Sequence, residues 1–373
     1  MKDWVKSKLS VIDELYPAER LERSKERWRR VWRGEKPLDR YPFVYAPVTF
    51  NYYDDVFKKE EGLKAYLDEF IVRGKVNDDF IPAFFPGCKQ GTIPSMFGSK
   101  EIVAGKDHSC ERVIFDSVDI DRLPEPSFGQ GTIAYEWLDM QRYYLNETEG
   151  RIPVHVADMQ GPVDVCGQLW GYDNVLTAPY EEPDYYHKLM GKVKDAFILF
   201  WKKQKELLGD NFVGTHLFGW DWVPEDMGAS LSADSMAMMS PSFFNDYYKS
   251  YLEEIGDSLG SLSVHSCGNF SAVVKSLCAI PCVKAVNAGQ MSVERLLEAG
   301  LDTNKVVISF EGVEYVDKVF ELVRRHQLRP DITLCGIWPE RDGKVAKPQD
   351  WTGKDWERIK EIEGRVLEEA SRL

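Results

Sequence analysis

The chain contains 373 residues, 43% hydrophobic and 29% charged, so it is long enough to bury a large core in one or two globular domains. A formal net charge of −14 opposes contact with phosphate backbones and anionic lipid, which excludes nucleic acid and membrane surfaces as expected partners. The sequence has no run of about 18 apolar residues and no apolar stretch near Met1 of the kind a secretion signal needs, so we expect a cytoplasmic protein.

Residues 1–40 are rich in charged and helix-favouring residues, and Trp28 and Trp32 lie four positions apart on one predicted helix face. They predict a helical N-terminal extension to a catalytic domain that covers residues 41–373. In that domain, short apolar runs alternate with amphipathic stretches. Eight runs are candidate strands, at 43–48, 80–85, 152–157, 212–219, 262–267, 283–288, 305–310 and 332–337.

This alternation predicts the fold class, an α/β protein built of parallel βα units. A count of about eight strands favours a (β/α)8 TIM barrel with an N-terminal helical extension, and an open doubly wound sheet is the alternative. Residues 86–134 are too long and irregular for one βα loop, and they predict an insert that contains a small hairpin. In the stretch 241–260, Pro241 suits the first turn of a helix and Gly260 suits its end.

The segment VHSCGNF at 264–270 places a histidine and a cysteine at the carboxyl end of a predicted strand. Because residues two apart in a strand point to the same face, His265 and Cys267 should project together, and Gly268 lets the chain turn away. A barrel gathers its catalytic groups at this end, and imidazole and thiolate are both good zinc ligands. Cys335, at the end of the last predicted strand, would supply a third ligand. Taken alone, such a pair is more often packed in the core, since free cysteine is among the most buried residue types.

Two motifs resemble those of the uroporphyrinogen decarboxylase superfamily. The segment MMSPSFFNDYYKSYLEEIGDSLGSLSVHSCGNF resembles its Ser-Pro helix followed by a strand that ends in His-x-Cys-Gly, and LCGIWP resembles its late Cys-Gly-Ile-x-Pro strand end. The branch of the superfamily that carries both motifs is the zinc-dependent, corrinoid-linked methyltransferases. The resemblance implies a TIM barrel and a zinc cofactor held at the positions of His265, Cys267 and Cys335.

The same resemblance implies a corrinoid (cobalamin) cofactor as the second reactant. The chain shows no corrinoid-binding motif of the Asp-x-His-x-x-Gly kind, so the corrinoid should be carried by a separate partner protein. Decarboxylases of the superfamily place arginines just after the first strand to hold substrate carboxylates. The corresponding stretch here, APVTFNYYDD, has no arginine, which disfavours decarboxylation of a porphyrinogen.

Further candidate site residues follow the predicted strands. Asp221 and Glu311 come directly after strand runs, and each is a candidate proton donor, fourth ligand or partner of a ligand. Four apolar side chains near strand ends should line a substrate pocket: Trp222, Trp338, Phe218 and Met159.

The residues and the resemblance together predict an enzyme, a corrinoid-dependent methyltransferase. It would take the methyl group from a small methoxylated substrate and transfer it to the cobalt of a corrinoid protein (O-demethylation). We expect an aromatic substrate, because aromatic side chains are predicted near the carboxyl ends of the strands. The alternatives are a methylcorrinoid:thiol methyltransferase with the same zinc ligands, a decarboxylase, and a zinc-binding barrel without catalytic activity. Whether the chain forms a homodimer is left open by the sequence.

Overall fold

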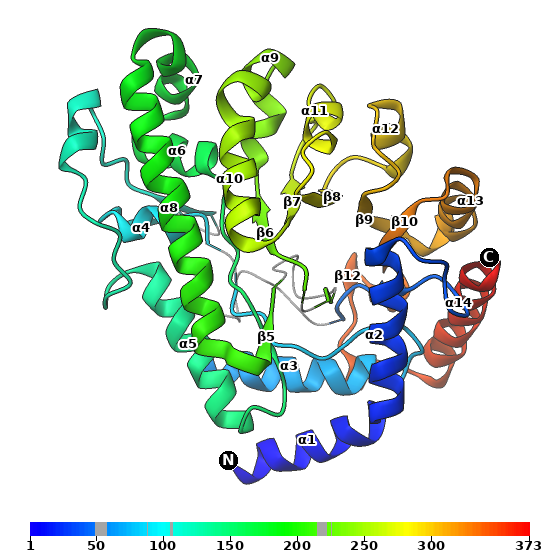
Figure 1. The fold of residues 1–373 in the computed structure, drawn as a ribbon. Helices are drawn as coiled ribbons and strands as arrows, with labels where there is room; N and C mark the ends of the chain where they lie inside the picture. The colour runs from blue at the N-terminus through cyan, green and yellow to red at the C-terminus, as the bar shows by residue number, and fades with distance from the viewer. Residues whose placement is uncertain (49–57, 88, 105–106, 215–221, 225) are drawn as a thin grey trace.

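A parallel β-sheet forms the centre of the protein in this computed structural model, which describes residues 1–48, 58–87, 89–104, 107–214, 222–224 and 226–373. Its six strands are hydrogen-bonded in the order β1-β10-β9-β8-β7-β6. Their bounds are β1 Phe43–Tyr45, β6 Ala229–Ser232, β7 Leu262–Ser266, β8 Val283–Ala288, β9 Val306–Gly312 and β10 Arg329–Cys335. The helices lie around the outside of these strands (Figure 1).

The segments between β1 and β6 in the chain extend this parallel arrangement. Strand β4 (Val154–His155) pairs in parallel with β5 (Phe212–Val213), and isolated bridges join Phe84 to Val154 and Gln160 to Ser232. The parallel sheet, the surrounding helices and their alternation along the chain are consistent with the predicted TIM barrel. Within the described residues, the hydrogen-bonded sheet does not close into a complete barrel.

The helices account for most of the remaining chain. The α-helices are α1 Asp3–Leu15, α2 Ala18–Arg33, α3 Lys59–Arg73, α4 Thr92–Met96, α5 Ile133–Thr148, α6 Pro162–Trp170, α7 Tyr172–Glu181, α8 Pro183–Leu208, α9 Pro241–Phe243, α10 Lys249–Leu259, α11 Val274–Cys278, α12 Val293–Glu298, α13 Val316–His326 and α14 Gly353–Ser371. Short 3₁₀ turns are η1 Ser117–Arg122, η2 Gly209–Asn211, η3 Asp234–Met238, η5 Val313–Tyr315 and η6 Pro348–Asp350, and η4 Phe244–Tyr248 is a π-helical turn. None of the described helices combines the length and the apolar character needed to cross a membrane.

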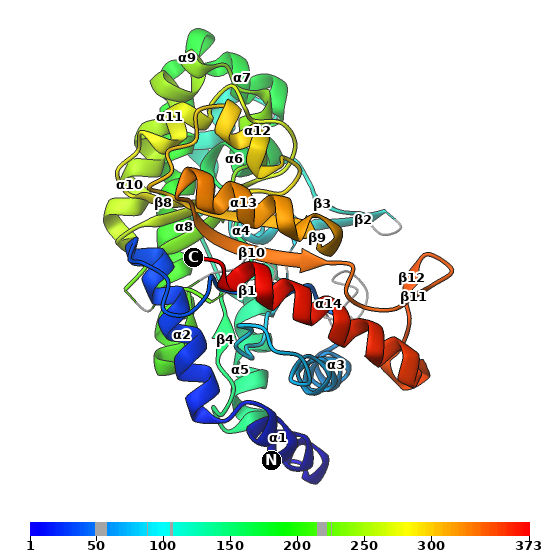
Figure 2. The same ribbon diagram turned by 90° about the vertical axis from the view of Figure 1, so that its right-hand side faces the viewer.

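Two short antiparallel hairpins project beyond the carboxyl end of β10 (Figure 2). One pairs β2 (Glu101–Ala104) with β3 (Asp107–Cys110), where the sequence predicts a hairpin. The other pairs β11 (Glu340–Arg341) with β12 (Lys344–Val345). The end of the sheet that a barrel uses for catalysis is therefore flanked by extra structure from two distant parts of the chain.

The helix predicted over 241–260 is present but interrupted. The side chain of Ser240 accepts a hydrogen bond from the backbone N–H of Phe243 at 3.1 Å, and Pro241 occupies the first helical turn. The π turn η4 then separates α9 from α10, and the chain leaves α10 at Gly260, whose φ of 99° suits glycine. This helix delivers the chain to the start of β7.

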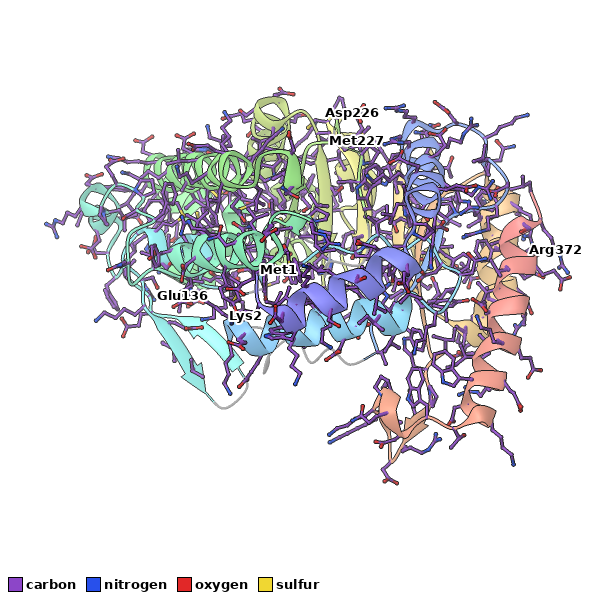
Figure 3. The ribbon with its side chains drawn as sticks, turned by 90° about the horizontal axis from the view of Figure 1, so that it is seen from below. Met1, Lys2, Glu136, Asp226, Met227 and Arg372 are labelled. Atoms are coloured by element: carbon purple, nitrogen blue, oxygen red, sulfur yellow. The ribbon has the colours of Figure 1, made fainter. Side chains whose placement is uncertain are left out.

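The N-terminal helices pack against the amino ends of the strands. Helix α1 lies across α3, and the predicted face of α2 is buried through Trp28 and Trp32 (Figure 3). The indole N–H of Trp28 donates to the backbone carbonyl of Asp79. The Asp79 carboxylate is fully buried, and it accepts hydrogen bonds from the guanidinium groups of Arg27 and Arg40. A neutralised ion cluster therefore fastens α2 to the segment that follows α3.

Candidate metal centre

Strand β7 brings His265 and Cys267 together at its carboxyl end. The strand is central in the sheet, paired with β6 on one side and β8 on the other, so its direction is fixed by neighbours on both sides. The imidazole of His265 is buried, the thiol of Cys267 is half-buried, and Nε2 lies 3.2 Å from Sγ. The next residue, Gly268, has a φ of 73°, which lets the chain turn away directly after the thiol.

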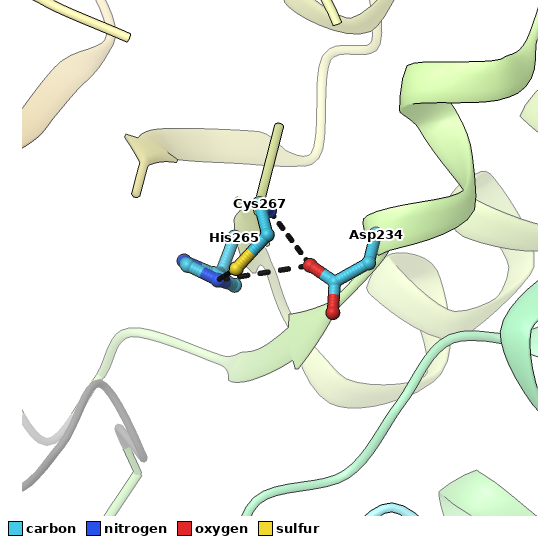
Figure 4. Close-up of side chains that lie close together, drawn as sticks. All are labelled: Asp234, His265 and Cys267. Atoms are coloured by element: carbon cyan, nitrogen blue, oxygen red, sulfur yellow. Dashed lines mark hydrogen bonds and ion pairs between the residues drawn. The ribbon is translucent and has the colours of Figure 1, made fainter. Parts of the chain in front are cut away.

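Asp234 is the third member of this cluster, and the sequence reasoning missed it. It is the first residue of η3, two positions beyond β6, and the pairing of Ser232 with His265 places it beside β7. One carboxylate oxygen lies 3.7 Å from His265 Nε2 and accepts the backbone N–H of Cys267 at 2.7 Å (Figure 4). The nitrogen, sulfur and oxygen atoms of the three side chains all lie within 4.8 Å of one another.

The buried side chain of Asn287 on β8 orients the histidine. Its amide oxygen lies 2.6 Å from His265 Nδ1. Because an amide oxygen only accepts, Nδ1 must carry the hydrogen, which leaves the lone pair of neutral imidazole on Nε2, facing Cys267 and Asp234. Gly289 leaves room for this ring, since a Cβ there would come within 2.9 Å of the histidine Cε1.

The electrostatics of the cluster disfavour a free thiolate. Burial raises the pKa of Cys267 to about 12, and the charge of Asp234 adds to the effect. Burial also raises the pKa of Asp164 to about 7, again with a contribution from Asp234. Among the described residues, no lysine or arginine forms an ion pair with Asp164 or Asp234. A bound cation would supply the missing positive charge and lower the pKa of the thiol.

Asp164 positions Asp234 indirectly. It lies on α6, fully buried, and its two carboxylate oxygens accept the backbone N–H and the hydroxyl of Ser235, each at 2.8 Å. Since Ser235 directly follows Asp234, these two bonds hold the start of η3 against α6. The carboxylate of Asp234 is thereby fixed relative to β7.

Cys335 and Glu311 lie at neighbouring strand ends on the far side of β8. Cys335 ends β10 and pairs with Gly312 of β9, and Glu311 precedes that glycine. Burial raises the pKa of Cys335, with Glu311 contributing, and burial also raises the pKa of Glu311. Cys335 is not part of the group formed by Asp234, His265 and Cys267. In this structure Cys335, the predicted third ligand, therefore stands apart from the other two predicted ligands.

The side chains predicted to line the substrate pocket do not gather in one place. Trp338 is 3% exposed, stacks on Trp351 with ring centroids 5.6 Å apart, and donates its ring N–H to the Ala46 carbonyl. It thus presents almost no surface to a ligand. Phe218 and Asp221 lie outside the described residues.

Trp222 and Met159 need correction as mouth residues. Trp222 lies under Lys25 and Arg29 of α2, beside the amino ends of β4 and β5. Met159 is fully buried, and its sulfur accepts the side-chain N–H of Gln204 on α8 at 3.5 Å. It points into the layer between strand and helix, since successive residues of an extended segment face opposite ways.

Comparisons with known proteins place the fold but not the chemistry. No protein-family model and no curated protein sequence matches this chain. The fold resembles that of a solved structure, a methyltransferase from Methanosarcina mazei, with a TM-score of 0.64 over 92% of this chain and 99% of that chain. The sequence identity is 14%, so this likeness establishes a common fold alone. What the centre does must be argued from its residues.

Proposed function

We propose that this protein is a zinc-dependent methyltransferase that takes the methyl group of a small methoxylated aromatic substrate and transfers it to the cobalt of a corrinoid carried by a partner protein. The observation that carries the proposal is the cluster of Asp234, His265 and Cys267 at the carboxyl end of a parallel sheet. The fold shared with a protein described as a methyltransferase supports it, as do the two motifs around His265 and Cys335.

The donor atoms of the cluster suit zinc. Imidazole nitrogen, thiolate sulfur and carboxylate oxygen are the three kinds of zinc ligand in proteins, and His265 Nε2, Cys267 Sγ and an oxygen of Asp234 supply one of each. Two anionic ligands balance the charge of a divalent ion. We propose Cys335 as a further ligand that would have to approach the cluster from β10, and the ion would then have to accept the substrate in addition to four protein ligands.

Bound zinc would act as a Lewis acid that stabilises negative charge on the oxygen released from the methyl group. Asn287 keeps the lone pair of His265 on Nε2, and Asp164 holds η3 so that Asp234 faces that nitrogen. In the reaction, the methyl–oxygen bond breaks with its electron pair left on the oxygen, while the reduced cobalt uses its own pair to form the bond to the methyl group.

The released oxygen then needs a proton. Glu311 is our proposed donor, because it lies near the carboxyl end of β9 and burial raises the pKa of its carboxyl. Its backbone pairs with Leu334, one residue before Cys335, so the side chains of Glu311 and Cys335 leave the sheet on opposite faces, and Glu311 must turn toward the substrate oxygen to protonate it. Asp221, the other candidate from the sequence, lies in the segment that the structure does not describe.

The direct test follows the spectrum of free cob(I)alamin mixed with methoxylated phenols or benzenes and the purified protein. We expect conversion to methylcobalamin with the wild-type protein and not with Cys267→Ala. Cys282→Ala is the matched control, since this half-buried thiol donates to backbone carbonyls of α10, is not part of the cluster and should leave the reaction unchanged.

Two other outcomes would replace the proposal. Consumption of methylcobalamin when a small thiol is added, without any response to methoxyaromatics, would show the thiol methyltransferase reaction at the same centre. Tight zinc binding with neither reaction would favour a zinc-binding barrel without catalytic activity.

A further inference from the structure

A second cavity opens at the opposite end of the strands from the metal centre. It measures about 490 Å³ and lies between the N-terminal helices and the amino ends of β4 and β5, at the end of the molecule where Met227 is labelled in Figure 3. This volume falls within the range of about 300–1,000 Å³ that is usual for small-molecule sites. We propose that this cavity binds a compact organic anion with an apolar body, independently of the metal centre.

The floor of the cavity is apolar and already well packed from behind. Seven of its apolar side chains are at most 7% exposed: Ile12, Tyr16, Ile81, Ile152, Val213, Trp222 and Val223. They come from α1, the α1–α2 connection, β5 and the segments that enter the strands, so the floor is held by several rigid elements. A ligand must therefore have apolar surface of its own, because a small inorganic anion would leave these apolar side chains in contact with water.

The rim carries more positive than negative charge, although the whole chain has a formal charge of −14. Three cations, Lys25, Arg151 and Lys205, line the cavity together with two acids, Asp13 and Asp210. Asp13 forms an ion pair with Arg151, so these two charges cancel. Lys25 forms an ion pair with Glu22, so Lys205 and the exposed Asp210 are what remain to meet a ligand.

Aromatic rings hold both lysines along the wall. The ammonium group of Lys205 lies 5.2 Å from the centre of the Trp201 ring and 5.6 Å from that of Phe212, and Lys25 lies 5.9 Å from Trp222. Such contacts orient an ammonium group but do not neutralise its charge. Lys205 has no ion pair with any described carboxylate, whereas Lys25 lies 3.5 Å from Glu22. A carboxylate or sulfonate group of a ligand would neutralise the positive charge of Lys205.

The experiment is a fluorescence titration of the full chain with 1-anilinonaphthalene-8-sulfonate, a probe that joins an apolar body to an anion. We expect one saturable site per chain and at least about fivefold weaker binding in Lys205→Glu. Lys202→Glu makes the same change of charge on the same helix without lining the cavity, and should bind like the wild type. Met227→Trp, at the half-buried rim, should obstruct the cavity and weaken binding too.

Competition tests whether the ligand needs its anionic group, and the Cys267→Ala variant tests whether the probe binds away from the metal centre. We expect 3-phenylpropionate to displace the probe and its neutral amide not to displace it. Equal displacement by both would overturn the role of the anion, and unchanged binding in both Lys205→Glu and Met227→Trp, or an equal loss in Lys202→Glu, would overturn the site. Cys267→Ala should leave the titration unchanged, and a parallel loss in that variant would place the probe at the metal centre instead.

Discussion

Both ends of the sheet contain buried carboxylates, and the two ends differ in whether the protein supplies a counter-ion for them. At the amino end, the fully buried Asp79 is neutralised by Arg27 and Arg40, which join α2 to the core. At the carboxyl end, Asp164 and Asp234 meet a histidine, a thiol and a serine, with no described arginine or lysine paired to either. A buried charge stabilises the fold where the protein supplies its own counter-ion. Where it does not, the site suits a cation from outside.

The largest expected effect comes from removing the charge that lacks a counter-ion. Asp234→Asn keeps an oxygen that accepts the N–H of Cys267 but removes the anion that we assign to the metal. We expect methyl transfer to fall by more than roughly 100-fold, beyond the 10–100-fold cost of changing a partner of a ligand. Asp226→Asn, an exposed aspartate at the other end of the molecule, is the control. Wild-type turnover in Asp234→Asn would remove this residue from the centre.

The opposite result is expected at the amino end. Asp79→Ala leaves the buried guanidinium of Arg40 without its carboxylate and that of Arg27 with Asp39 alone, so we expect a loss of about 3–5 kcal/mol in the free energy of unfolding, measured by denaturant titration. Zinc affinity of the folded protein should not change. Asp39→Ala removes the more exposed partner of Arg27 and should cost less than about 1 kcal/mol. Equal losses in both variants would contradict a special role for the buried cluster.

Asn287 tests whether the histidine is oriented for a metal. Asn287→Ala removes the acceptor for His265 Nδ1, and we expect zinc affinity, measured by chelator competition, to fall roughly 10–100-fold. Asn287→Asp retains an acceptor oxygen and should recover most of the affinity. If alanine and aspartate behave alike, the hydrogen bond does not set the tautomer that binds the metal.

The smallest expected effect is that of Asp164→Asn. The asparagine oxygen can accept the N–H of Ser235 and its amide can donate to the serine hydroxyl, so both contacts survive. We expect a change below about 1 kcal/mol in unfolding free energy, whereas Asp164→Ala leaves a buried N–H unpaired and should cost about 1–3 kcal/mol. Calorimetry of the two variants would show the difference. A large loss in Asp164→Asn would mean that the charge itself is required.

The sequence predicts the later strands well because each of them coincides with a distinct run of apolar residues. Strands β7 to β10 fall on four predicted apolar runs, and each run is bounded by turn or helix signals. Strand β6 is missed because Ala229–Ser232 is only four residues long and alternates Ala229 and Leu231 with serines, so it has no continuous apolar run. Asp234 is missed with it, since its place beside His265 follows from the pairing of β6 with β7.

Two of the predicted pocket residues lie elsewhere for a different reason. Trp222 was expected to follow the carboxyl end of the strand run at 212–219, of which residues 215–219 lie outside the described part of the chain, and Trp222 itself lies at the amino ends. Met159 was expected at the mouth, and its side chain points to α8. The direction of a side chain depends on strand register and on which neighbours pair, and a local pattern of residue types does not contain that information.

Metal analysis of the purified protein tests the central claim most directly. After incubation with zinc and removal of free metal, we predict about one zinc ion per chain in the wild type, and little in Cys267→Ala. Cys282→Ala should retain the wild-type content, since its thiol lies away from the cluster. A wild-type protein that retains no zinc, or a Cys267→Ala variant that binds zinc as tightly as the wild type, would contradict a metal centre at Asp234, His265 and Cys267.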